Sequence, residues 1–442
     1  MIVTERYRLT GRTATEILAS LESTIRDGGL VASDLVPTVR ALADELGVAP
    51  GTVASAYRTA AQRGLVETRG RKGTRVRPRP AVAVRDGGGP VPEGVVDLAS
   101  GQPAAALLPR LDPARPGWDR AAAPDGLVLP ALADLARRRL VADGVDAEHL
   151  TLAGGGLDAI RRVLAARLAS GDAVAVEDPG WPNLLDLLAS SGFRAVPVRV
   201  DQAGPDAASL AAALRNGARA VVVTSRAQNP TGAYVTAERA TALRRVLAGH
   251  PDVLVVEDDH AAELAGVPLA PLAGATQAWA FVRSLSKPYG PDLRLAVLAG
   301  DGATVARVEG QLRIGSGWVS TLLQRAAVAL WTDPEVATVV AAAAQAYDVR
   351  REALRTGLVA AGLPALGATG LNVWVPVPDE ARVVAELLAA GWAVAPGQRF
   401  RQGVGSAVRV TVSNLEPDRV EELVGLLRAA ASPRRTGGPV SA

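Results

Sequence analysis

The 442-residue sequence contains no cysteine, which excludes disulfide bonds, thiolate nucleophiles and cysteine-ligated metal. The absence suits a reducing compartment. The three histidines, His149, His250 and His260, lack the spacing of metal ligands, so we expect no metal site. No apolar run is long enough to span a membrane, and the first residues have no signal-peptide character. We therefore expect a cytoplasmic protein.

Lysine is nearly absent as well. Only Lys72 and Lys287 are lysines among the 48 basic residues. A guanidinium stays protonated and cannot attack a carbonyl, whereas a desolvated amine can lose its proton and form a Schiff base. Most lysines are surface cations, but the residues around Lys287, in Ser284-Leu-Ser-Lys-Pro-Tyr-Gly-Pro-Asp-Leu-Arg294, indicate a chemical role for its amine.

Positive charge is concentrated at the N-terminus. Residues 1–80 hold 13 basic against 8 acidic side chains, whereas the rest of the chain has a small acidic excess. Such an end is expected to meet a polyanion. The length and the 48% hydrophobic content predict two or three folded units with sizeable cores.

Apolar residues at helical spacing predict three helices, over residues 13–27, over residues 38–46 and from about Thr52 onward. Two short strands, 65–69 and 74–77, follow around a Gly-Arg-Lys-Gly turn and predict a hairpin with a basic tip.

This order, together with the run from Val36 to Tyr57, resembles the winged helix-turn-helix of GntR regulators. The resemblance implies binding to operator DNA. Its candidate contacts are Arg40 to the backbone, Thr52 in the major groove, and Arg71 with Lys72 at the minor groove.

The rest of the chain has a different pattern. Residues 78–94 are rich in proline and glycine and predict a linker. Short apolar runs then alternate with helical stretches, which predicts an α/β domain with a mostly parallel sheet covered on both faces. We therefore expect a DNA-binding domain at 1–77, the linker at 78–94, a large domain at 95–330, a small α+β domain at 331–431 and a disordered tail at 432–442.

The large domain carries the residue types that chemistry on pyridoxal 5′-phosphate (PLP) requires, namely a lysine amine, a phosphate cradle, an acid for the ring nitrogen and a planar group against the ring. Glycines before a helix can hold a phosphate through their amides. A resemblance to fold type I aminotransferases assigns these roles to Lys287 as the amine, to Asp258 as the acid, to Trp181 as the planar group, and to a cradle of Gly154, Gly155, Gly156, Ser284, Ser286 and Arg294.

The order of these motifs resembles that of fold type I aminotransferases from about Val95 to Ala430, and the whole chain resembles the MocR subfamily of GntR regulators. The resemblance implies PLP held by Lys287 as an internal aldimine. It also implies that Asn229, in Gln-Asn-Pro-Thr-Gly, bonds the phenolic oxygen of the cofactor, and that Arg409 grips a ligand carboxylate. A homodimer is expected on the same ground.

The sequence departs from the family at two places. His260 stands where a tyrosine is usual, and we expect its imidazole to bind the cofactor in the tyrosine's place, at the phenolic oxygen. A second expected tyrosine is absent from the run Ala121–Gly126. Three functions remain open. The favoured one is a transcriptional regulator that senses an amino compound or PLP. The others are an active aminotransferase with an appended DNA module, and a binding protein whose PLP pocket is empty and serves only as a dimerisation scaffold.

Overall fold

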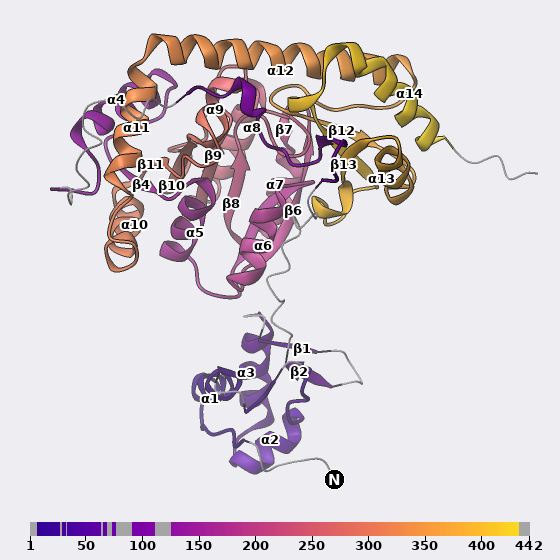
Figure 1. Cartoon of the computed structure of the whole chain (residues 1–442). Coiled ribbons are helices and arrows are strands. Elements are labelled where there is room, and N and C mark those ends of the chain that lie inside the picture. The colour runs from indigo at the N-terminus through magenta and orange to yellow at the C-terminus, as the bar shows by residue number, and fades with distance from the viewer. Residues whose placement is uncertain are drawn as a thin grey trace, which may run out of the picture. The chain divides into compact units, whose positions relative to one another are not determined.

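The computed structural model describes residues 7–26, 29–31, 33–62, 65–68, 73–76, 91–110 and 125–432. These residues form an N-terminal module, up to residue 76, and a larger α/β body from residue 91 (Figure 1). All but the first residue of the predicted tail 432–442, most of the predicted linker and the tip of the hairpin with Arg71 and Lys72 lie outside the described residues.

The N-terminal module contains the three predicted helices and the hairpin. Helices α1 (Ala14–Arg26), α2 (Val39–Leu46) and α3 (Pro50–Gln62) precede β1 (Val66–Thr68) and β2 (Thr74–Val76), which pair antiparallel. Helix α3 begins two residues before the predicted Thr52, because proline suits the first turn of a helix, where its missing N–H costs nothing.

Local signals define the limits of α2. The Thr38 side chain accepts a hydrogen bond from the Ala41 amide at 3.2 Å, and Gly47 ends the helix with a φ of 64°. One face of each helix is buried in a common core, as the apolar spacing predicts. Its fully buried members include Ile17, Leu21, Leu42, Val53 and Ala60.

The body contains an eight-stranded sheet in the order β4-β11-β10-β9-β8-β5-β6-β7. The strands are β4 (Leu150–Ala153), β5 (Ala173–Asp178), β6 (Arg194–Asp201), β7 (Gly204–Pro205), β8 (Ala218–Thr224), β9 (Leu254–Asp259), β10 (Ala278–Ser284) and β11 (Ala296–Gly300). Strands β8, β9 and β10 are parallel, as predicted, whereas β11 runs antiparallel to both of its neighbours, β10 and β4.

Helices pack against this sheet, in agreement with the predicted α/β class. Helix α5 (Gly156–Arg167) contacts β9 and β10, α7 (Ala207–Arg215) contacts β8, and α10 (Gly302–Ile314) contacts β4 and β11. Five further helices belong to the part of the body before residue 333: α4 (Pro130–Ala142), α6 (Pro182–Ser190), α8 (Ala237–Ala248), α9 (Ser286–Tyr289) and α11 (Thr321–Thr332).

The register of the sheet brings distant segments to one edge. Ser284 at the end of β10 is opposite Ala296 at the start of β11, and Ala296 is opposite Ala153 at the end of β4. The glycines after β4, the residues after β10 and Arg294 before β11 therefore meet at the edge where β8 and β9 also end. This is the edge at which open α/β sheets bind ligands.

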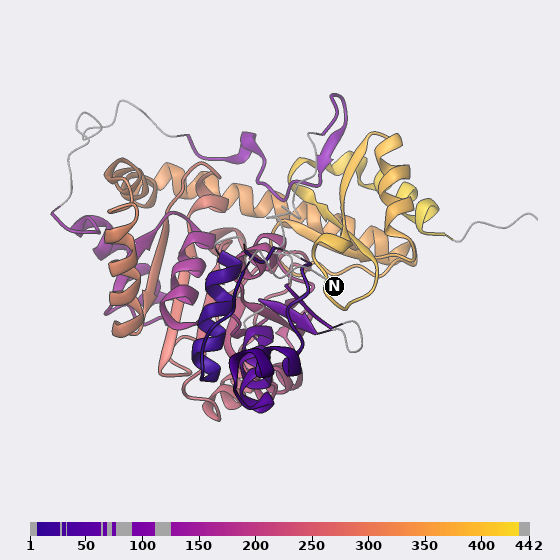
Figure 2. The ribbon, with the colours of Figure 1, turned by 90° about the horizontal axis from the view of Figure 1, so that it is seen from below.

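The 27-residue helix α12 (Pro334–Ala360) leads to the small domain, and both views show it running along the body from α11 to the C-terminal strands (Figures 1 and 2). Helices α13 (Glu380–Ala389) and α14 (Val420–Ala431) accompany a sheet in the order β12-β14-β13-β3. Its strands are β12 (Asn372–Pro376), β14 (Ala407–Thr411), β13 (Trp392–Pro396) and β3 (Val96–Leu98).

Strand β3 differs from expectation. We expected these residues in the large domain, but they pair in parallel with β13 and thereby join the sheet of the small domain. Three residues carry too little pattern to reveal a partner almost 300 positions away. Leu98 is fully buried in the core of that domain, together with Trp392 and Val410.

Within the described part of the chain, no single helix is long and apolar enough to cross a membrane. Helices α11 and α12 pass that test of length and composition only when taken together, as a pair bent by 79°.

Candidate functional site

A cavity of about 260 Å³ lies at the carboxyl edge of the large sheet, where the large and small domains and the residues after β3 come together. Its lining contains most of the side chains predicted to bind a cofactor. The predicted residues that line it are Gly156, Trp181, Asn229, Asp258, His260, Ser284, Ser286, Lys287, Arg294 and Arg409. Residues as far apart in the sequence as Gly156 and Arg409 therefore form one site.

Lys287 is half-buried on the short helix α9 and lines the cavity. Its Nζ donates hydrogen bonds to the backbone oxygen of Gly101, at 2.7 Å, and to Oε1 of Gln102, at 3.0 Å. The amine is thus held by two acceptors from the residues that follow β3. Sequence analysis missed both, because nothing in the pattern around residue 101 indicates a partner for a lysine.

The predicted phosphate cradle is close-packed. The side-chain oxygens of Ser284 and Ser286 are 2.8 Å apart, and Arg294 Nη2 donates to the Gly154 carbonyl at 3.2 Å. Gly155 has a φ of 103°, and a Cβ there would lie 2.4 Å from Arg294 Nη2. Only glycine permits this approach of the guanidinium to the backbone before α5.

The glycines are not equivalent. Gly156 lines the cavity, whereas the amide of Gly154 donates to Asp158 Oδ2 at 3.1 Å. Burial alone would raise the pKa of Asp158, but hydrogen bonds from Arg162, Arg161 and Gly154 hold it below its usual range. A carboxylate from the first turn of α5 therefore uses the Gly154 amide and leaves a phosphate the amides that follow it.

Asp258 is the penultimate residue of β9 and is 4% exposed. Its Oδ2 lies 3.4 Å from Nδ1 of His260, while Oδ1 is buried and has no hydrogen-bond partner among the described residues. A buried carboxylate oxygen without a partner is costly. A protonated ring nitrogen of a bound cofactor would satisfy it, so this side chain fits the acid role that PLP requires.

Trp181 and Asn183 line the cavity from the start of α6. Trp181 is half-buried and offers a planar surface. Asn183 was not predicted, although its Oδ1 is buried and unpaired within the described structure. Its position two residues after the tryptophan was the available signal, and an amide there can meet a polar group of a ligand.

Arg409 is 2% exposed in β14 and already has several partners. Its Nη1 donates to Asn229 Oδ1 at 3.0 Å, its Nη2 donates to the Ala99 carbonyl, and its guanidinium lies over the ring of Phe400 at 4.8 Å. The structure therefore brings Arg409 and Asn229 together, and a ligand carboxylate would have to compete with these partners.

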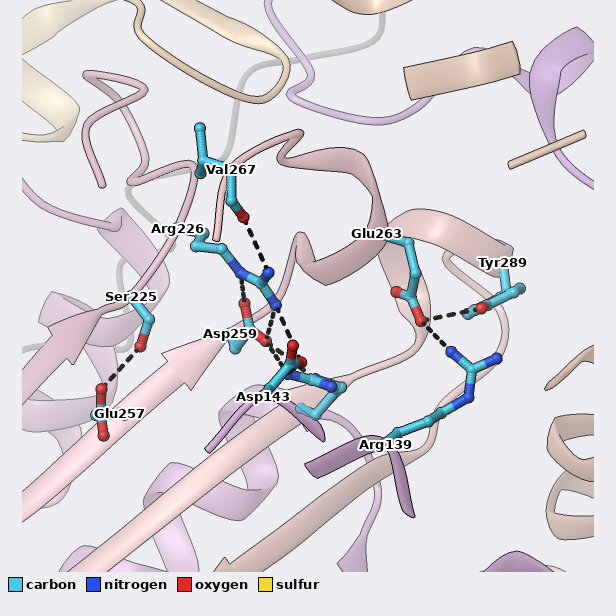
Figure 3. A network of polar contacts seen from close by, with 10 residues as sticks. Arg139, Asp143, Ser225, Arg226, Glu257, Asp259, Glu263, Val267 and Tyr289 are labelled. Atoms are coloured by element: carbon cyan, nitrogen blue, oxygen red, sulfur yellow. Dashed lines mark hydrogen bonds and ion pairs between the residues drawn. The ribbon is translucent and has the colours of Figure 1, made fainter. Parts of the chain in front are cut away.

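A layer of buried ion pairs supports this edge of the sheet (Figure 3). Asp259 accepts hydrogen bonds from Arg226 at 2.7 and 2.9 Å and from Arg283 at 2.7 and 3.0 Å, and Arg283 also reaches Asp143 at 2.6 Å. Burial alone would raise the pKa of Asp259, but the hydrogen bond from Arg226 and the charge of Arg283 hold it below the usual range. Asp259 thus remains an anion that fixes the end of β9 next to Asp258.

Two other carboxyl groups behave differently. Burial raises the pKa of Glu177 and of Glu257 to about 7, although both accept hydrogen bonds. Glu177 accepts from Thr224 and Gln228, and Glu257 accepts from Ser225 and from the amides of Leu272 and Ala273. Neither residue lines the cavity, and their hydrogen bonds connect β5 and β9 to neighbouring segments.

The candidate DNA contacts lie in the N-terminal module. Arg40 is exposed on α2, and Thr52 is half-buried in the first turn of α3. The other two predicted contacts, Arg71 and Lys72, fall outside the residues that the structure describes.

Comparison with known proteins agrees with this two-part structure. Residues 13–76 match the family "Bacterial regulatory proteins, gntR family", and residues 94–427 match "Aminotransferase class I and II". The vitamin B6 salvage pathway transcriptional repressor PtsJ of Salmonella typhimurium is 39% identical over 425 residues, which cover 95% of this chain and 99% of PtsJ.

Two further comparisons concern parts of the chain. The pyridoxine biosynthesis transcriptional regulator PdxR of Corynebacterium glutamicum is 30% identical over 278 residues, or 58% of this chain and 59% of PdxR. The structure of the α-aminoadipate aminotransferase LysN of Thermus thermophilus, complexed with N-(5′-phosphopyridoxyl)-L-leucine, superposes with a TM-score of 0.69 at 20% identity, over 79% of this chain and 96% of LysN. That likeness establishes the fold of the body.

Proposed function

Because the chain belongs to the MocR subfamily of GntR transcriptional regulators, we propose that it controls transcription in response to PLP bound at Lys287. Residues 1–77 would bind operator DNA, and residues 95–431 would bind the cofactor. The pocket would then act as a sensor, since a ligand shifts an equilibrium between two arrangements only if it binds them with different affinity.

One observation carries the cofactor proposal: Asp258, whose buried Oδ1 has no hydrogen-bond partner among the described residues, lines the same cavity as Lys287. A buried carboxylate oxygen without a hydrogen-bond partner is costly unless a bound molecule supplies one. The groups that line the cavity suit one molecule with a basic ring nitrogen, an aldehyde and a phosphate.

The residues of the chain divide the work of holding such a molecule. Lys287 would supply the amine, Asp258 would keep a proton on the ring nitrogen, and Trp181 would cover a ring face. Ser284, Ser286, Arg294 and the amides from Gly155 onward would bind the phosphate. Bound PLP would supply an aldehyde and an electron-accepting ring.

His260 and Asn229 complete the arrangement. His260 orients Asp258 through the 3.4 Å contact, a task for which an imidazole suffices. Asn229, held by Arg409, would turn its amide nitrogen toward the phenolic oxygen, since its Oδ1 is already occupied.

Two observations favour PLP itself as the effector over an amino acid. Arg409, the expected carboxylate grip, is bound to Asn229 and to the Ala99 carbonyl, so a carboxylate must displace existing hydrogen bonds. The relative PtsJ is named for vitamin B6 salvage. We therefore propose that the regulated genes concern vitamin B6 supply and that transcription is repressed.

Three further proposals complete the function. The basic N-terminal part binds DNA phosphates through residues such as Arg40. The protein acts as a homodimer, because two modules would read two operator half-sites. It works in the cytoplasm, where bacterial DNA is found.

The test combines spectroscopy with DNA binding. Full-length protein mixed with PLP is expected to develop a visible absorbance band that Lys287→Ala removes. PLP is also expected to change the affinity of the wild-type protein, but not of Lys287→Ala, for the DNA segment upstream of its own gene. An unchanged affinity in the presence of bound PLP would refute the sensing role.

An aminotransferase with an appended DNA module is the second candidate, favoured by the presence of Lys287, Asp258 and Arg409 in one cavity. It predicts steady conversion when an amino acid and a 2-keto acid are supplied together. If product formation continues well beyond one equivalent of protein, the enzymatic reading replaces the sensing one.

A further inference from the structure

The residues Ala99–Gln102, here the 99–102 segment, follow β3. Two cations that line the cavity, Lys287 and Arg409, donate hydrogen bonds to this segment. Lys287 donates to Gly101 and Gln102, and Arg409 donates to the Ala99 carbonyl. We propose that Gly101 and Gln102 are positioning residues that hold the Lys287 amine in the unliganded protein, and that cofactor binding releases the 99–102 segment. This inference rests on the proposed function.

The chemistry requires that Lys287 gives up at least one of these two hydrogen bonds. To bond an aldehyde, the ammonium first gives one proton to water, and the neutral amine then attacks the carbonyl carbon. The aldehyde oxygen leaves as water with two protons, and a carbon–nitrogen double bond forms. The nitrogen that began with three N–H donors keeps at most one. It therefore cannot donate to both Gly101 and Gln102 after the reaction.

The segment is anchored on either side of the part that Lys287 holds. On one side, Asp97 Oδ1 accepts from the amides of Ala99 and Ser100, at 2.8 and 3.0 Å, and β3 pairs with β13. On the other side, the Ala104 amide donates to the hydroxyl of Tyr347 at 3.0 Å. The carbonyl of Gly101 and the side chain of Gln102 lie between these anchors.

The fit at Gly101 is tight. Its φ is 70°, and a Cβ there would lie 3.0 Å from both Nη1 and Nη2 of Arg409. The first part of the segment thus contacts Arg409, and its last two residues bind Lys287. A chemical change at the Lys287 amine therefore alters its hydrogen bonds to the segment and leaves the one from Arg409 in place.

The position of the segment in the sequence gives the release a use. Strand β3 begins at Val96, two residues after the predicted linker 78–94 to the DNA-binding module. The hydrogen bonds of the Lys287 amine therefore end on residues close to the point where the predicted linker joins the body. Coupling of this kind needs two arrangements of a single element, which the held and released segment would provide.

Gln102→Leu tests the proposal without disturbing the core, because Gln102 is exposed. The unliganded protein loses a hydrogen bond to a charged group, and the loaded protein loses none. We expect the Kd for PLP, from titration of the absorbance band, to fall about fivefold. Gln277→Leu, at another exposed glutamine of the body, is the control and leaves the Kd unchanged. A Kd for Gln102→Leu that rises or stays the same overturns the proposal.

Hydrogen exchange of the full-length protein gives a second, structural readout. In the wild type, PLP is expected to speed amide exchange in the peptide around residues 99–103, and in Gln102→Leu exchange there is already faster without PLP. Slower or unchanged exchange in PLP-saturated wild type contradicts the release. If no absorbance band forms in the wild type, the proposed function itself fails; if the band forms and exchange does not respond, only the release fails.

Discussion

His260 lies against the carboxylate of Asp258, with Nδ1 3.4 Å from Oδ2, while the second oxygen of the carboxylate is buried without a partner within the described structure. One oxygen thus contacts an imidazole, and both residues line the cavity.

Asp258→Asn is expected to weaken PLP binding by about tenfold to a hundredfold, because a neutral amide cannot balance a protonated ring nitrogen as a carboxylate does. Titration of the visible band measures the effect. Asp252→Asn, at an exposed position before the same strand, is the matched control and keeps wild-type affinity. If the two variants bind PLP with equal affinity, Asp258 does not pair with the ring nitrogen of the cofactor.

Gly155→Ala is expected to reduce PLP affinity at least tenfold, because the new Cβ would collide with Arg294 and push it from the cradle. The control is Gly310→Ala, inside α10, where a Cβ meets no atom within 4 Å. That substitution leaves PLP binding intact and slightly stabilises the helix. Retained affinity in Gly155→Ala would show that Arg294 does not hold the phosphate.

Arg409→Ala is expected to lower the free energy of unfolding by about 2 kcal/mol, since it leaves Asn229 Oδ1 and the Ala99 carbonyl without a donor. Urea denaturation of the unliganded protein measures the change. Arg313→Ala removes only an exposed contact to Glu309, and we expect a change below about 0.5 kcal/mol. A small effect for Arg409→Ala would mean that its contacts are weak enough for a ligand carboxylate to displace.

The buried Glu177 gives a pH dependence of stability. Its pKa is raised to about 7 in the folded protein, so the folded state binds the proton more tightly than the unfolded chain. The stability this group contributes is therefore complete below its unfolded pKa and is lost as pH rises toward 7, with a slope of at most about 1.4 kcal/mol per pH unit. Glu257 acts in the same direction.

Denaturation of Glu177→Gln at pH 5.5 and at pH 8 tests this reasoning. The variant is expected to lose less stability between the two pH values than the wild type does. Glu335→Gln, at an exposed position on α12, is expected to keep the wild-type difference. If the wild type loses no more stability than Glu177→Gln between pH 5.5 and pH 8, the assigned sign is wrong.

Arg40→Ala and Arg71→Ala are each expected to weaken binding to the upstream DNA and to reduce the slope of log affinity against log salt by about 1, because each removes one phosphate or groove contact. Fluorescence anisotropy at several salt concentrations measures both quantities. Arg137→Ala, exposed on α4 of the body, keeps the wild-type slope. Unchanged binding of both module variants would refute the DNA surface.

Local pattern was sufficient to predict the three helices and the hairpin of the N-terminal module. The three N-terminal helices follow from apolar spacing, from Thr38 as a cap and from Gly47 as a stop, all of which act within a few residues. For the pocket, the lysine in an arginine-rich chain gave the first signal, and the resemblance to fold type I aminotransferases assigned the roles of the other residues.

What sequence could not supply is the set of partners. The pairing of β3 with β13 depends on a fit between segments almost 300 residues apart, and so do the bonds of Lys287 to Gly101 and Gln102 and of Arg409 to Asn229. Nor does the pattern distinguish Gly154, whose amide is taken by Asp158, from Gly156, which lines the cavity.

The sequence by itself determined the chemical inventory and the order of the elements, because propensity, capping and apolar period are local properties. Only the tertiary structure decided that the carboxylate of Asp258 keeps one oxygen unpaired within the described residues and that the amine of Lys287 is held by residues next to the linker. Those facts depend on which chain segments pack together and exclude water, and packing is a property of the whole fold.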